Sequence, residues 1–92
     1  MPDKITFYAV VDRATTVENP YGLVRRLKYG DGGFDDETIR RDFSWEFTPA
    51  IVEWEHGDLD YELVEISSEQ AHRIIEGYFR EKWGTFGQPL DS

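Results

Sequence analysis

The segment KITFYAVVD, residues 4–12, decides the fold predicted for this chain. Phe7 and Ala9 lie on one side of an extended chain, and Tyr8 and Val10 lie on the other, because side chains alternate along a strand. Both sides are rich in apolar residues that favour strands. A strand that is apolar on both faces is typical of the interior of a sheet. We therefore expect residues 4–12 to form a central strand.

Three further segments have the pattern of strands. Residues 23–29 follow a turn that contains Pro20, and their mixture of apolar and basic side chains fits a half-exposed strand with a basic outer face. Residues 38–47 come directly after an acidic stretch at 35–37, and residues 59–66 complete the set. The cleanest period-two alternation, at residues 38–47, predicts a strand with one buried face formed by Phe43, Trp45 and Phe47.

Two segments have helix signals. Thr48 and Pro49 suit the cap and the first position of a short helix that reaches about His56. Ser67 is placed to cap a longer helix over residues 68–83, because its hydroxyl can accept a hydrogen bond from the backbone of the first turn. The apolar stripe of this helix recurs at three- and four-residue spacing and consists of Ala71, Ile74, Ile75, Tyr78, Phe79 and Trp83.

These elements predict an α+β domain. We expect a small antiparallel sheet of about four strands, covered on one face by the C-terminal amphipathic helix, with a short extra helix. Residues 1–84 would form this single domain, and residues 85–92 would form a flexible C-terminal tail. The length of 92 residues fits one domain, since two independent cores would need about twice as many.

The composition narrows the class of protein. The chain carries 10 Lys and Arg against 19 Asp and Glu, so its formal net charge is −9. It has no cysteine, which excludes disulfides and thiolate chemistry, and no apolar run long enough to span a membrane. The first residues carry no apolar signal region. We therefore expect a cytoplasmic protein with no membrane contact, and its negative charge argues against direct nucleic-acid binding.

The acidic excess lies in the second half of the chain. Residues 47–92 hold 3 basic and 10 acidic residues, a net of −7. An acidic surface attracts basic partners, and tryptophan and tyrosine often anchor protein interfaces. The leading hypothesis is a non-enzymatic module that binds a protein partner, expected to be basic. Its candidate interaction surface consists of Glu53, Trp54, Glu55, Asp58, Asp60 and Tyr61.

No motif for metal, cofactor or catalysis stands out. The acids at 58, 60 and 62 superficially resemble a calcium loop, but Leu63 occupies the position that requires glycine. His56 and His72 are not spaced as a metal-binding pair on a helix. We therefore predict no metal, no cofactor and no catalytic residue.

An alternative from another class is a small enzyme or a binder of an anionic ligand. Arg25, Arg26, Arg40 and Arg41 would hold the anion, and a histidine would act as acid or base. The other explanation of these arginines is internal charge pairing. Two further hypotheses are an inhibitor that mimics DNA and a homodimer formed through an unpaired strand edge.

Three blocks in order resemble a family of small acidic actinobacterial proteins of unknown function: NPYGLVRR at 19–26, RDFSWE at 41–46 and LVEISSEQA at 63–71. With their spacers they cover residues 5–80. The resemblance implies a single-domain intracellular bacterial protein and carries no activity. The chain departs from the family pattern at residues 47–49, where proline is expected directly after the Trp-Glu pair, and in the heavier acidic stretch after Gly57.

Overall fold

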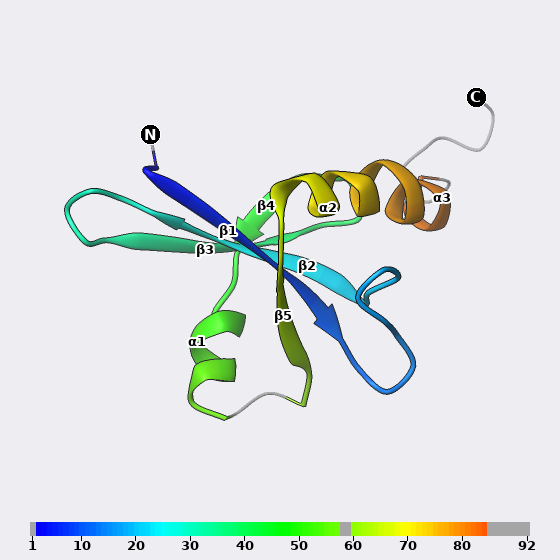
Figure 1. Ribbon diagram of the computed structural model, residues 1–92, viewed down its shortest axis with the longest axis horizontal. Helices are drawn as coiled ribbons and strands as arrows, with labels where there is room; N and C mark the ends of the chain where they lie inside the picture. The colour runs from blue at the N-terminus through cyan, green and yellow to red at the C-terminus, as the bar shows by residue number, and fades with distance from the viewer. Residues whose placement is uncertain (1, 58–59, 85–92) are drawn as a thin grey trace.

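The computed structural model describes residues 2–57 and 60–84, which form a five-stranded antiparallel sheet with helices on both faces (Figure 1). The α+β architecture is the predicted one, with five strands where about four were expected. Along the sheet the order is β4-β3-β2-β1-β5. In chain order the elements are β1 (Lys4–Val11), β2 (Gly22–Lys28), β3 (Phe34–Ile39), β4 (Trp45–Phe47), α1 (Ala50–Glu55), β5 (Glu62–Ile66), α2 (Ser68–Arg73), the π-helical η1 (Ile74–Phe79) and α3 (Arg80–Trp83).

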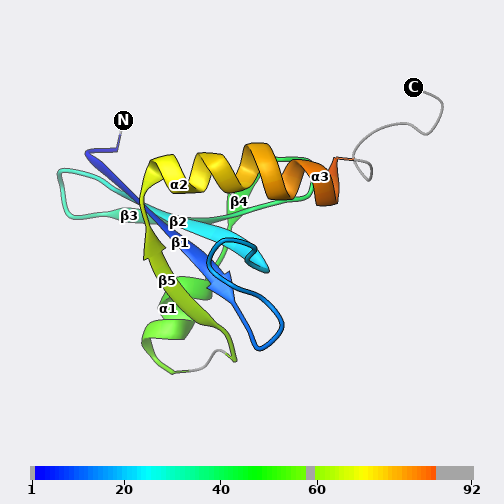
Figure 2. The same cartoon turned by 45° about the vertical axis from the view of Figure 1, so that its right-hand side comes forward.

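Different helices pack against the two apolar faces of β1. Phe7 and Ala9 pack beneath the C-terminal helix, which runs from α2 through η1 to α3. Val10 packs in a second cluster against α1, with Tyr8 at its margin. Figures 1 and 2 show the C-terminal helix and α1 on opposite sides of the sheet. The predicted central strand is confirmed, since β1 lies between β2 and β5.

The strand predicted over residues 38–47 is wrong in its bounds, because the chain reverses within it. Its predicted buried face is wrong at Phe47, which is 78% exposed. β3 and β4 form a hairpin in which Ile39 pairs with Trp45. The turn closes where the amide of Arg40 donates to the carbonyl of Ser44 (2.8 Å), and Phe43 adopts a left-handed backbone with φ of 69°. The carboxylate of Asp42 accepts from the amide and the hydroxyl of Ser44 (3.0 and 2.6 Å), which stabilises this turn and lowers the pKa of Asp42.

The C-terminal helix has the predicted extent, with a difference in its middle. Ser67 caps it as expected, because its Oγ accepts from the amide of Gln70 (3.0 Å). Over Ile74–Phe79 the backbone is π-helical, so residues five apart share a face. Phe79 is therefore buried below Ile74, and Tyr78 is only half-buried. No helix in the described part of the chain is long and apolar enough to cross a bilayer.

The predicted short helix forms as α1 and ends at Gly57, where φ is +79°. Thr48 supports its start, because its Oγ1 accepts from the amide of Ala50 (3.2 Å). The flexible tail predicted at 85–92 lies outside the described residues, as does Asp58 of the candidate interaction surface.

Two glycines allow a test of these helix geometries. A Cβ added at Gly77 or at Gly57 would have no other atom within 4 Å, so packing is the same at both positions. Gly77→Ala is expected to raise the free energy of unfolding by about 0.5–1 kcal/mol, because helical backbone suits alanine better than glycine. Gly57→Ala is expected to lower it by about 1–2 kcal/mol, because alanine disfavours a positive φ. Urea unfolding of the two variants checks the opposite signs, and a loss of stability in both would contradict the helical placement of Gly77.

Candidate functional sites: an acidic surface and a cationic groove

Exposed carboxylates gather where α1 lies beside β5. Glu53 and Glu55 belong to α1, Asp60 lies just before β5, and Glu65 lies within it. We call these four residues the acidic surface. In the described part of the chain only Glu55 among them forms an ion pair. No three carboxylate or histidine side chains within residues 2–57 and 60–84 are placed to share a metal ion.

The phenol of Tyr8 reports how close the acids of the two elements lie. Burial raises the pKa of Tyr8, and the negative charges of Glu65 and Glu55 raise it further. Both carboxylates therefore act on the same hydroxyl, one from β5 and one from α1. Two of the four carboxylates of the acidic surface, Glu55 and Glu65, therefore lie near one phenol although they belong to different elements.

The two aromatic residues predicted as anchors are partly buried in the fold. Trp54 is half-buried and tilts against the ring of Tyr8, with centroids 6.5 Å apart. Tyr61 is half-buried and stacks on Tyr21 at 5.3 Å. Tyr21 is 55% exposed and was not among the predicted interaction residues. The exposed aromatic ring near this surface is therefore that of Tyr21.

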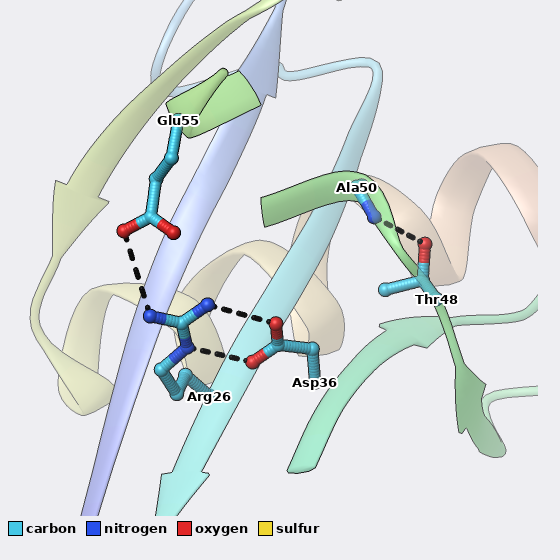
Figure 3. A network of polar contacts seen from close by, with 5 residues as sticks. All are labelled: Arg26, Asp36, Thr48, Ala50 and Glu55. Atoms are coloured by element: carbon cyan, nitrogen blue, oxygen red, sulfur yellow. Dashed lines mark hydrogen bonds and ion pairs between the residues drawn. The ribbon is translucent and has the colours of Figure 1, made fainter. Parts of the chain in front are cut away.

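Arg26 is held in a partly buried network on the α1 face of the sheet (Figure 3). Its Nε donates to Oδ1 of Asp36 (2.8 Å) and its Nη2 donates to Oδ2 (2.9 Å). Its Nη1 lies 3.5 Å from Oε2 of Glu55, so the network ties α1 to the sheet. The hydrogen bonds to Asp36 raise the pKa of Arg26.

Arg25 lies on the opposite face, because successive strand residues alternate. Its Nε and Nη2 donate to Oε1 of Glu37 (2.9 and 2.7 Å), and its guanidinium stacks 4.1 Å above the ring of Trp45. Arg25 and Arg26 therefore do not share one anion site. Both are charge-paired with β3, which was the other explanation weighed for them.

Arg40 and Arg41 are brought together in the turn between β3 and β4, where they line a groove of about 540 Å³. Lys82 of α3 lines the same groove. His72 instead shares a separate cleft of about 250 Å³ with Arg25. The enzyme hypothesis placed a histidine beside at least two of the four arginines, and these two cavities do not make that combination.

The contribution of Lys82 was missed in the sequence. Lys82 and Arg40 are 42 positions apart, and only the packing of the C-terminal helix beside the β3–β4 turn brings them to one groove. The local sequence pattern around either residue does not predict that the two will line the same groove.

Comparisons with known proteins identify no family for this chain. The chain matches no protein-family model, no curated protein and no solved structure. The resemblance to the actinobacterial family therefore stays a prediction, and function has to be argued from the two surfaces themselves.

Proposed function

We propose that the protein is a non-enzymatic cytoplasmic binding module that engages a basic partner protein through the acidic surface. The observation that carries this proposal is the set of four exposed carboxylates on α1, on β5 and just before β5, of which only Glu55 is ion-paired in the described part of the chain. Unpaired surface charge of one sign raises the rate at which an oppositely charged partner arrives. The absence of cysteine fits a reducing compartment.

The edge of the sheet supports contact once the partner has arrived. β5 is an edge strand that pairs with β1 on one side, and its Val64 is 37% exposed. Exposed strand edges accept extended segments through backbone hydrogen bonds. A second copy of this chain could use the same edge, but two molecules of net charge −9 repel each other, which favours a basic partner.

Charge reversal at three positions tests the surface. The triple variant Glu53→Lys, Asp60→Lys and Glu65→Lys leaves the Glu55–Arg26 pair intact. We expect its association with a fluorescent oligolysine peptide at low salt to be roughly tenfold slower, since electrostatic steering changes on-rates by that order or more. Stopped-flow measurements at two ionic strengths should also show a weaker dependence on salt.

The matched control places the same charge change elsewhere. Asp3→Lys, Glu18→Lys and Glu81→Lys are exposed positions outside the acidic surface, and either triple takes the formal net charge from −9 to −3 because each reversal adds two. We expect the control to slow association much less. Equal slowing in both triples would mean that total charge alone matters, and it would overturn the proposed surface.

A capture experiment from cell lysate, which compares the original chain with the same two triple variants, tests for the physiological partner. A protein that supports the proposal is retained from cell lysate at low salt by the original chain and the control triple, and it is lost with the surface triple and at high salt. If no protein shows this pattern, the proposal fails. Displacement of the captured protein by DNA would identify it as a nucleic-acid-binding protein, the partner class that the DNA-mimic hypothesis predicts.

A further inference from the structure

The groove beside the β3–β4 turn has the dimensions of a ligand site. Its volume of about 540 Å³ falls within the range of roughly 300–1,000 Å³ that is usual for small-molecule pockets. It is built from several elements of the sheet together with α3, so its shape depends on tertiary packing. The groove is distinct from the acidic surface, because none of the four carboxylates of that surface lines it.

One part of the groove is apolar. Val10, Val24 and Leu63 line it from the adjacent strands β1, β2 and β5. The stacked rings of Tyr21 and Tyr61 line it as well. The valine and leucine side chains are nearly buried and form the floor, so the apolar surface offered to a ligand comes mainly from the two tyrosine rings.

Another part of the groove is cationic. Arg40, Arg41 and Lys82 line it together with one acid, Glu46, which gives a local formal charge of +2 in a protein of −9. Nη1 of Arg40 lies 3.4 Å from Oε2 of Glu46, and both side chains are about half exposed. Such exposed pairs are worth about 1 kcal/mol or less, so a ligand anion can compete for the guanidinium. Arginine has five N–H donors, which leaves others for the ligand.

We propose that this groove binds a small organic anion. Arg40 would hold its carboxylate together with Lys82, whose Nζ would leave its exposed hydrogen bond to the hydroxyl of Tyr78 (3.3 Å), a residue outside the groove. A flat apolar body would lie against the Tyr21 and Tyr61 rings. The combination of charge and apolar surface selects this class over inorganic anions, which would gain nothing from the apolar part, and over neutral aromatics, which would gain nothing from the cations.

Naphthoate is a suitable probe, because it joins a carboxylate to a flat aromatic body. In an NMR titration of the ¹⁵N-labelled chain, we expect saturable shifts of the amides of Val24, Thr38 and Thr48, which belong to groove residues. Naphthalenemethanol, the neutral analogue, and acetate, which lacks the aromatic body, should each bind at least tenfold more weakly. Equal binding of either analogue would overturn the proposed combination.

Paired variants locate the anion. Arg40→Gln with Lys82→Gln should weaken naphthoate binding roughly tenfold or more, since a hydrogen bond to a charged group is worth about 1.5–3 kcal/mol. Arg73→Gln with Lys4→Gln makes the same charge change at exposed positions outside the groove and should leave the affinity within about twofold. Equal weakening in both pairs, or the absence of saturable shifts with the original chain, would overturn the proposal.

Discussion

Replacing Asp36 with alanine is expected to lower the free energy of unfolding by about 3–5 kcal/mol, because it leaves a buried charge without its partner. Asp36 is 4% exposed, and its carboxylate accepts both hydrogen bonds of the Arg26 fork. After the substitution the one carboxylate that Arg26 keeps in the described part of the chain is that of Glu55, which is half exposed and 3.5 Å away. The Arg26 guanidinium also lies 4.1 Å from the centre of the Phe34 ring. Urea unfolding followed by tryptophan fluorescence measures the loss, because Trp54 lies on the helix that this network holds.

The neighbouring ion pair gives the matched control. Glu37 pairs with Arg25 in the same two strands, but both side chains are more than a fifth exposed. Glu37→Ala should therefore cost only about 1 kcal/mol or less. If Asp36→Ala costs no more than Glu37→Ala, burial does not set the strength of the Arg26–Asp36 pair.

A double variant separates the net contribution of the ion pair to the free energy of unfolding from the cost of removing only one partner. Arg26→Met with Asp36→Leu removes both charges and leaves apolar side chains of similar volume. Replacing a whole buried pair in this way is often neutral or stabilising. We expect the double variant to be more stable than Asp36→Ala alone, which a double-mutant cycle quantifies.

Side-chain periodicity predicted most elements of the fold. The two-sided apolar pattern of residues 4–12 identified the central strand, and the Ser67 cap identified the start of the C-terminal helix. The alternation through residues 43–47 was misleading, because Phe43 lies in a turn and still packs near Trp83, with ring centroids 6.3 Å apart. A partly buried aromatic residue in a tight turn can thus extend the alternation of a strand beyond the strand itself.

The arginine-rich segments show what could have been inferred and what could not. Strand alternation alone places adjacent Arg25 and Arg26 on opposite faces, so a single site containing both was already disfavoured. Their partners were harder to find, because the acidic stretch at 35–37 was expected before the third strand and it lies inside β3. The groove depends on contacts between distant segments, for which the sequence holds no local pattern.

The π-helical segment leads to the second large expected effect. Phe79→Ala should lower the free energy of unfolding by about 3–5 kcal/mol, because it removes a fully buried ring and leaves a cavity. Phe79 is 0% exposed and stacks on Trp83 with centroids 3.9 Å apart. It reaches this position through the π-helical turn, which aligns it with Ile74 five residues earlier. Chemical denaturation followed by circular dichroism measures the change.

Two comparisons show whether burial and helix geometry are the cause. Phe47→Ala makes the same chemical change at a ring that is 78% exposed, and it should alter stability by no more than about 0.5 kcal/mol. Tyr78→Ala tests the spacing, because a regular α-helix would place Tyr78, four residues after Ile74, over the core in place of Phe79. A larger loss for Tyr78→Ala than for Phe79→Ala would contradict the π-helical register. The expected loss is far greater at Phe79 than at Tyr78, because the π-helical segment turns Phe79 toward the sheet in place of Tyr78. It is smallest at Phe47, because that ring on β4 is exposed to solvent.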